Sequence, residues 1–266
     1  NQVKYNYIFD QKFRRIISTG IEKIEVAVKA SWANYLATTH NTSHPHEDTN
    51  IFKASVCQTG HPNNITAFDK LVESYRNSKE VFALHYKTNH ADMNTPPIWV
   101  TALLLTIGEL LNWIHGIQDP RDKKGIFLDF PFSYKVMLSI LNHLRWVRNV
   151  CAHNGRLWNK RTPILFTTIK SMSNDLVLSA DGSKLDSKIY NTLLVMAEIL
   201  RSIDPNYPFI YFIKDLIKSS KYIKPALMGF PRNWEDLPIW NTPSPLPKVI
   251  INKKAKRQKR RAKKKT

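Results

Sequence analysis

Residues 145–159, RWVRNVCAHNGRLWN, contain the side-chain types needed for acid–base chemistry on a phosphate ester. Histidine titrates near neutral pH, so His153 could take up or release a proton. Arg148 carries a permanently charged planar guanidinium that matches phosphate oxygens. Asn149 could orient either side chain by a hydrogen bond. Metal-free RNA cleavage needs a base for the 2′-hydroxyl, an acid for the leaving 5′-oxygen and a cation at the phosphate, which these residues could supply.

A helix that ends near Gly155 must position these side chains. Ser133 suits its N-cap, and Gly155 suits the C′ position just beyond its end. At about 100° per residue, Arg148 lies about 140° from His153 around the helix axis. The two side chains would therefore face one point only if the last turn unwound. The predicted buried stripe is Met137, Ile140, Leu141, Leu144, Val147 and Cys151, and the predicted polar arc is Asn142, Arg145, Asn149 and His153.

An ordinary helix end is the simplest alternative, with Arg148 paired to an acid and His153 bonded to backbone. A carboxylate on a nearly apolar helix is costly unless it is paired. We therefore expect a carboxylate to neutralise Arg145 or Arg148 and so support the site. The candidates are Glu22, Glu25 and Glu109, although surface ion pairing accounts for Glu22 and Glu25 equally well.

A zinc site is a second alternative, and it would use Cys57, His61, Cys151 and His153. Their spacing does not match the close-paired pattern of zinc sites, and a cysteine on an apolar stripe is more simply a small buried hydrophobe. A polar loop also carries His40, His44 and His46. They lack an obvious fourth ligand, so we expect them to be solvated and predict no metal or other cofactor.

The residues around and after the motif interleave positive charge with an aromatic ring. This arrangement suits a phosphate backbone and a stacked base. The alternative, equally consistent with the sequence, is that Leu157 and Trp158 dock the loop on the core while the charges are only solvated. The RNA contacts predicted here are Arg145, Asn154, Arg156, Trp158, Lys160 and Arg161.

The chain is strongly basic, with a net charge of +19 over 266 residues. Such a field attracts polyanions, so RNA is the expected partner. Residues 253–266 hold ten Lys or Arg and no acid. We expect residues 248–266 to form a disordered basic tail that binds RNA non-specifically. The contacts predicted in it are Lys253, Lys254, Lys256, Arg257, Lys259, Arg260 and Arg261.

Helical periodicity runs through most of the remaining chain, and no convincing strand alternation appears. The expected helices cover residues 7–40, 67–86, 97–114, 133–155, 186–200 and 208–219, in an all-α single domain over residues 1–247. The longest apolar stretch, residues 98–114, is too short for a comfortable membrane span and contains Glu109 and Asn112, so we expect a buried helix. Two cysteines and no signal peptide predict a cytoplasmic protein, and the absence of an initial Met suggests a missing N-terminal segment.

Several segments together resemble a known family. RNVCAHNGRLWN contains the Arg-polar-x3-His signature of HEPN ribonucleases, and its wording resembles the Abi-like family of bacterial abortive-infection proteins, the AbiD and AbiF group. FDQKFRRIISTGIEKIEVAVK resembles the early helix of that family, and PPIWVTALLLTIGELLNW resembles its middle helix. MGFPRNWEDLPIW resembles its closing segment. The four segments follow the order of the family and span nearly the whole body.

The resemblance implies an all-α, HEPN-type helical bundle that cleaves RNA as a toxin or phage-defence effector. The family motif maps onto Arg148, Asn149 and His153, and the products would carry 2′,3′-cyclic phosphate and 5′-hydroxyl ends. HEPN enzymes usually pair two motifs and this chain has one, so a homodimer is implied. A structured non-coding RNA would restrain the toxin. The family usually has a Tyr- and Arg-rich segment before the early helix, and the sequence begins just after the place where that segment is expected. The alternative is a non-catalytic RNA-binding protein whose motif grips phosphate.

Overall fold

The computed structural model describes residues 2–60, 64–90 and 93–241, and the predicted tail at 248–266 lies outside them. Over the described ranges the chain is helical, with two isolated bridges and no strand, which confirms the all-α prediction. The α-helices are α1 Gln2–Thr39, α2 Ala54–Cys57, α3 Ala67–Asn77, α4 Val81–Asn89, α5 Ile98–Leu104, α6 Ile107–Gly116, α7 Pro120–Ile126, α8 Tyr134–Ala152, α9 Tyr190–Ile203 and α10 Phe209–Lys218. Short 3-10 turns are η1 Pro45–Glu47, η2 Lys170–Met172, η3 Pro225–Met228, η4 Trp234–Asp236 and η5 Pro238–Trp240.

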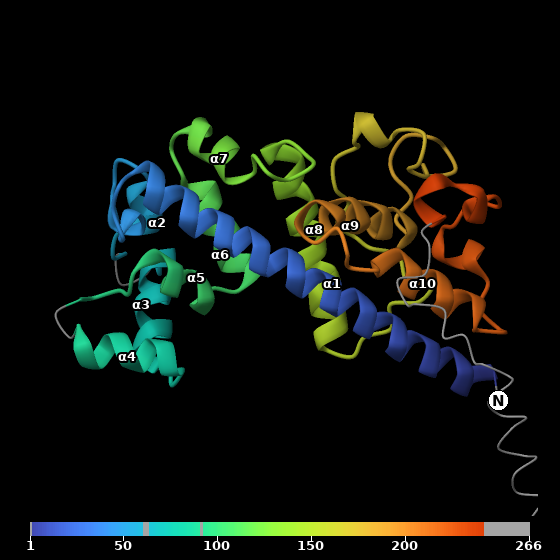
Figure 1. The fold of residues 1–266 in the computed structure, drawn as a ribbon, viewed down its shortest axis with the longest axis horizontal. Helices are drawn as coiled ribbons and strands as arrows, with labels where there is room; N and C mark the ends of the chain where they lie inside the picture. The colour runs from blue at the N-terminus through green and yellow to red at the C-terminus, as the bar shows by residue number, and fades with distance from the viewer. Residues whose placement is uncertain (1, 61–63, 91–92, 242–266) are drawn as a thin grey trace, which may run out of the picture.

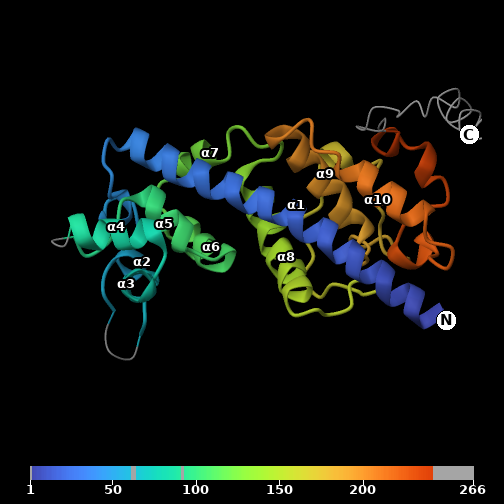
Figure 2. The same ribbon diagram turned by 60° about the horizontal axis from the view of Figure 1, so that its bottom comes forward.

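Helix α1 is the spine of the molecule and runs along most of its length (Figures 1 and 2). Helices α2 to α7 flank its C-terminal half, and α8, α9 and α10 flank its N-terminal half. Apolar residues at three- and four-residue steps give α1 a continuous face that packs on α5, α7, α8, α9 and α10. The core side chains of this face are Phe9, Phe13, Ile17, Ile21, Ile24, Val28, Trp32 and Leu36.

Helix α1 is continuous through Gly20 in its middle. A Cβ atom at Gly20 would lie 2.8 Å from Met196 Cε and 3.2 Å from Phe209 Cε2. The missing side chain therefore lets side chains of α9 and α10 pack directly on the spine, and a larger residue would force those side chains to move. The buried side chains of α1, α8, α9 and α10 belong to one hydrophobic cluster that also includes α5 and α6. The single domain over residues 1–247 stays a prediction.

The single helix predicted over residues 97–114 is wrong, because the chain leaves the helical path at Leu105. Thr106 starts α6 with a capping box: its hydroxyl accepts the N–H of Glu109 at 3.3 Å, and the Glu109 carboxylate accepts the N–H of Thr106 at 2.8 Å. These reciprocal bonds satisfy the first donors of a new helix. None of the helices in the described ranges is both long and apolar enough to cross a membrane.

The single helix predicted over residues 67–86 is also wrong, because it divides into α3 and α4. Ser78 and Glu80 have extended backbones between the two helices. Lys87 of α4 donates from its ammonium to the carbonyl oxygens of Arg76 at 2.8 Å and Ser78 at 2.7 Å. A cation thus satisfies carbonyls that the end of α3 leaves without helical partners.

Candidate functional site

Helix α8 stays regular up to Ala152 and ends in a Schellman motif. Asn154 adopts the left-handed conformation, with φ of 54°, and donates its N–H to the carbonyl of Cys151 at 3.1 Å. Gly155 donates its N–H to the carbonyl of Val150 at 2.8 Å. The C′ residue is therefore Asn154, and the prediction of Gly155 at this position is wrong by one residue. Asparagine tolerates the left-handed conformation better than most side chains, which permits the exchange.

The predicted buried stripe of α8 is confirmed: Met137, Ile140, Leu141, Leu144, Val147 and Cys151 are all buried. In the predicted polar arc Asn142 and Arg145 are half-buried, while Asn149 and His153 are exposed. The motif residues Arg148, Asn149 and His153 are all exposed to solvent. His153 is the C-cap residue, and its N–H donates to the carbonyl of Asn149 at 3.0 Å. Arg148 lies in the last turns of α8 and His153 caps its end, so ideal helix geometry separates their starting directions by about 140°. The last turn does not unwind to bring them together.

A buried ion pair on α1 holds the loop that follows the motif. Asp10 and Arg14 are only 5% and 7% exposed, and their side chains pair with one another. The other oxygen of Asp10 accepts the backbone N–H groups of Leu157 at 3.0 Å and Trp158 at 2.6 Å. Arg14 also donates to the carbonyl of Gly155 at 3.3 Å. The carboxylate and the guanidinium thus satisfy polar groups of a loop that packs on the core.

Among the described residues, no ion pair joins Glu22, Glu25 or Glu109 to Arg145 or Arg148, and the carboxylate that holds the loop after the motif is Asp10. Glu25 pairs with Lys29 at 2.9 Å, Glu109 caps α6, and Glu22 is exposed. Asp10 and Arg14 carry a weak signal in the sequence, because they stand four residues apart beside the apolar stripe of α1. The same spacing occurs in ordinary surface ion pairs on helices, so it does not point to a loop far along the chain.

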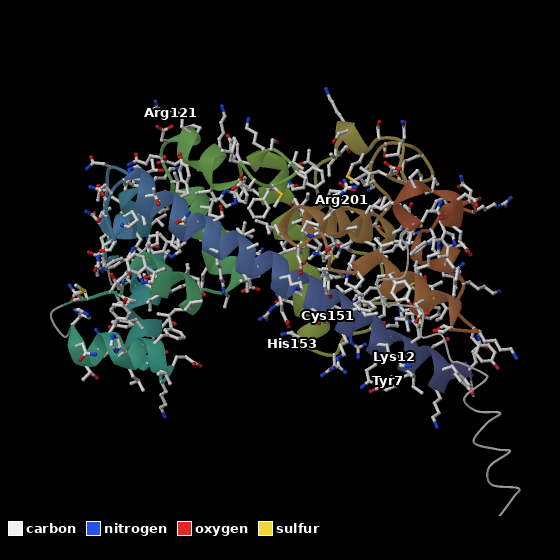
Figure 3. All side chains as sticks on the ribbon, viewed as in Figure 1. Tyr7, Lys12, Arg121, Cys151, His153 and Arg201 are labelled. Carbon is white, nitrogen blue, oxygen red and sulfur yellow. The ribbon has the colours of Figure 1, made fainter. Side chains whose placement is uncertain are left out.

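Cys151 lies at the point where α8 meets α1, close to His153 (Figure 3). Burial raises the pKa of its thiol, and a hydrogen bond from Ser18 together with the charge of Arg14 opposes the rise. Cys57 is also buried, and its thiol donates to the carbonyl of Phe52 at 3.6 Å. Neutral buried thiols are poor metal ligands. In the described part of the chain no three His, Cys, Asp or Glu side chains lie together as a metal site would require, and His61 lies outside it.

The predicted RNA contacts fall into two groups. Asn154 and Arg156 are exposed, and Arg156 has no ion pair with any described residue. The side chains of the second group already contact the protein. The ammonium of Lys160 lies 5.4 Å from the ring centroid of Trp146, and the guanidinium of Arg161 lies 3.7 Å from the carboxylate of Asp186. The stem of Arg145 packs over Gly108 of α6, and Trp158 is half-buried with its indole N–H unpartnered. The seven predicted tail contacts lie outside the described residues.

The expectation that His40, His44 and His46 are solvated is wrong for His46. Its side chain is fully buried and its Nε2 lies 3.0 Å from the hydroxyl of Thr95. Burial, and to a smaller extent the charge of His44, lowers the pKa of His46 to about 3. His40 lies 3.0 Å from the carboxylate of Asp122. These contacts belong to the packing of the C-terminal half of α1.

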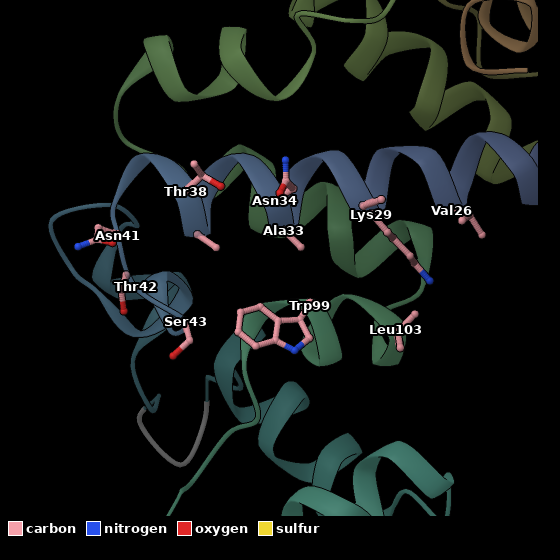
Figure 4. A pocket seen from close by; sticks show the side chains of 12 residues that line it. Val26, Lys29, Ala33, Asn34, Thr38, Asn41, Thr42, Ser43, Trp99 and Leu103 are labelled. Atoms are coloured by element: carbon pink, nitrogen blue, oxygen red, sulfur yellow. The ribbon is translucent and has the colours of Figure 1, made fainter.

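A cavity of about 730 Å³ lies between α1 and α5, where Trp99 faces the helix spine (Figure 4). Small and apolar side chains such as Ala33 and Leu103 line most of it. Its cation, Lys29, is already paired with Glu25. This lining offers little to a phosphate group, so the end of α8 is the better candidate for chemistry on RNA.

A match to a known family identifies the family of this chain. The family model described as Abi-like protein matches residues 1–159. The chain belongs to the Abi-like family. The matched region runs from α1 to the loop after α8, so this Abi-like protein carries both the exposed motif and the Asp10–Arg14 pair inside it. The closing segment near Trp234 lies beyond the match. No curated protein and no solved structure matches the chain.

Proposed function

We propose that this Abi-like protein is a HEPN-type, metal-independent endoribonuclease that acts as a toxin or phage-defence effector in abortive infection. Family membership supports the abortive-infection role. The observation that carries the nuclease is the joint exposure of Arg148, Asn149 and His153 at the end of α8. The buried Asp10–Arg14 pair fixes the loop behind them, which supports a site held in a defined geometry.

In the proposed reaction His153 takes the proton of the 2′-hydroxyl, or returns a proton to the leaving 5′-oxygen. Arg148 stabilises the charge that builds up on the phosphate, and Asn149 orients these groups. The attack of the 2′-oxygen on phosphorus leaves a 2′,3′-cyclic phosphate and a 5′-hydroxyl. Since Arg148 and His153 diverge in one chain, a site would combine them from two chains of a homodimer. Neither a metal nor another cofactor takes part.

RNA is proposed both as substrate and as regulator. The net charge of +19 supports binding to a polyanion. Asn154 and Arg156 are exposed beside the motif and suit direct contacts. Arg145, Trp158, Lys160 and Arg161 would shape the surface around them, and the basic tail would add non-specific affinity. A structured non-coding RNA would occupy this surface and so restrain the toxin in the cytoplasm.

The second candidate is a non-catalytic RNA-binding protein that uses the motif to grip phosphate. The divergence of Arg148 and His153 favours it if the protein acts as a monomer. The two functions differ in what a substitution does. In a binding protein, loss of Arg148 weakens RNA affinity and every other effect together. In a nuclease, cleavage disappears while binding persists.

The deciding experiment incubates wild-type protein and His153→Ala with a mixed RNA in excess EDTA and identifies the fragment ends by mass spectrometry. His90→Ala is a matched control, because His90 is likewise an exposed histidine at the C-cap of a helix, α4. We expect cyclic phosphate ends with wild type and His90→Ala, and no cleavage with His153→Ala. Tight binding without cleavage by all three, after removal of co-purified RNA, would refute the nuclease.

A further inference from the structure

A second feature with chemistry lies where the first turns of α1 meet the segment after α10. A cleft of about 290 Å³ is open there to solvent. Tyr5, Asn6 and Lys12 line it from α1, and Lys221 and Tyr222 line it from the other side. Its floor is apolar, formed by side chains that include Phe9 and Ile223. The cleft therefore combines an apolar base with aromatic, amide and cationic groups at its rim.

Two aromatic rings meet at this cleft. The ring centroids of Tyr5 and Tyr222 are 5.3 Å apart, with planes tilted by 48°. Tyr5 is 57% exposed, although it is a large ring next to a hollow. Exposed aromatic rings at the edge of a groove are the platforms on which single-stranded nucleic acids stack their bases.

Two lysines at the cleft have no acidic partner among the described residues. Lys12 is exposed, and the ammonium of Lys221 lies 5.7 Å from the ring centroid of Tyr222. Lys218, one turn earlier, is paired with Glu235 at 2.5 Å. The cleft thus keeps cations that are available to an anion, beside a ring that can hold a base.

Asn6 adds an unsatisfied acceptor. Its side-chain oxygen is buried and has no hydrogen-bond partner. A buried acceptor without a donor costs free energy, so a turn of this side chain into the cleft to accept an N–H or O–H of a ligand would recover that cost. A ribose 2′-hydroxyl or a base N–H supplies such a donor, whereas a phosphate group alone does not.

We propose that this cleft binds a nucleotide of single-stranded RNA outside the cleavage motif. The base stacks on Tyr5, the ribose or base donates to Asn6, and Lys12 and Lys221 contact flanking phosphates. Lys12 at the cleft and Asp10, which holds the loop after the motif, stand two residues apart on α1. The cleft and the motif therefore lie beside the same turns of α1. The inference rests on the proposed function only in taking RNA as the ligand.

The test measures binding of a short labelled single-stranded RNA by fluorescence anisotropy, with His153→Ala as the background so that the RNA stays intact. Tyr5→Ala removes the ring, and Tyr5→Phe keeps it without the hydroxyl. Tyr222→Ala tests the opposite wall and does not alter α1. Lys184 is an exposed lysine on the loop before α9. Lys184→Ala is therefore the control that shows how much of the effect of Lys221→Ala comes from the loss of one positive charge. Circular dichroism verifies that each variant is folded.

We expect Tyr5→Ala to weaken binding about fivefold or more, the range for loss of one stacked base. Tyr5→Phe should bind within about twofold of the background, and Lys221→Ala should weaken binding more than Lys184→Ala. Unchanged RNA affinity of both Tyr5→Ala and Tyr222→Ala would overturn the proposal that the cleft binds RNA. So would an acidic polypeptide that competes for the protein as well as unlabelled RNA does. If the cleft fails this test, cleavage of RNA by the wild-type protein would still support the proposed nuclease. Conversely, RNA binding that depends on the cleft, without any cleavage by wild type, would refute the proposed nuclease and support the proposed RNA site in the cleft.

Discussion

Asp10 accepts the backbone N–H of Trp158 at 2.6 Å, although 148 residues separate the two along the chain. The same carboxylate oxygen accepts the N–H of Leu157, and the other oxygen pairs with Arg14. The loop that follows His153 is thus fixed by the first turns of the spine helix and not by α8 alone. A defined position for the motif depends on this buried pair.

Asp10→Ala should lower the free energy of unfolding by about 3 kcal/mol or more. The substitution leaves the charge of Arg14 buried without a partner, which costs about 3–5 kcal/mol, and leaves two backbone donors unpaired. Urea unfolding followed by circular dichroism measures the change.

Arg14→Met in the same Asp10→Ala background should recover part of the loss, because the unpaired buried charge is then gone. Additive losses in the two single variants and the double variant would show that the pair contributes no coupling. Arg121→Ala in the exposed pair of Arg121 and Asp119 is the control, since it keeps the Asp119 cap of α7 and should cost less than about 1 kcal/mol.

Asn154→Gly should raise the free energy of unfolding by a few tenths to about 1 kcal/mol, and Asn154→Ala should lower it by about 1 kcal/mol. The residue has φ of 54°, where glycine is unstrained and alanine is disfavoured. Because the side chain is exposed, no cavity accompanies either change. Equal stability of the two variants would contradict the Schellman motif. If Asn154 also contacts RNA, Asn154→Gly should be stable but bind RNA more weakly.

The helices were predictable to the extent that local spacing determines them. The apolar steps along α1 and α8 predict both helices and their buried faces, because those side chains face the core at every turn. The break at Thr106 was missed, since the capping box with Glu109 lies inside an apolar run. Asn154 and Gly155 both suit a left-handed residue, and only the hydrogen bonds of the α8 end distinguish them.

The exposed motif was predictable, but its support was not. Arg148, Asn149 and His153 stand out because their residue types and spacing match a known signature. Asp10 and Arg14 act on a loop far along the chain, and no local pattern reports such a contact. The same holds for the cleft at Tyr5, because Tyr222 reaches it only through the packing of α10 on α1.

Stability should fall as the pH is lowered from about 6.5 toward 3. The pKa of His46 is about 3 in the folded protein, against an ordinary value of 6.5. Between these values the unfolded chain binds a proton that the folded chain does not, so the free energy of unfolding rises with pH. His46 alone contributes a slope of about 1.4 kcal/mol per pH unit. Urea unfolding at a series of pH values measures it.

His46→Gln should flatten this slope even if it lowers stability at neutral pH. Burial also lowers the pKa of His143, so part of the slope should remain. His90→Gln, at an exposed histidine, is the control for a substitution that removes no buried imidazole. Equal slopes for wild type and His46→Gln would show that the buried imidazole does not control acid stability.

Mixing two inactive variants should restore cleavage if the site combines two chains. Five residues of an ideal helix turn through about 140°, so Arg148 near the end of α8 and the C-cap residue His153 start in different directions within one chain. In a mixed dimer of Arg148→Ala and His153→Ala, one of the two sites keeps an intact arginine and an intact histidine. Random pairing then restores about a quarter of wild-type activity, while each variant alone stays inactive. Mixing two preparations of His153→Ala is the control. A mixture that stays inactive, although exchange of subunits is verified, would require both residues from one chain and hence an unwound end of α8 during catalysis.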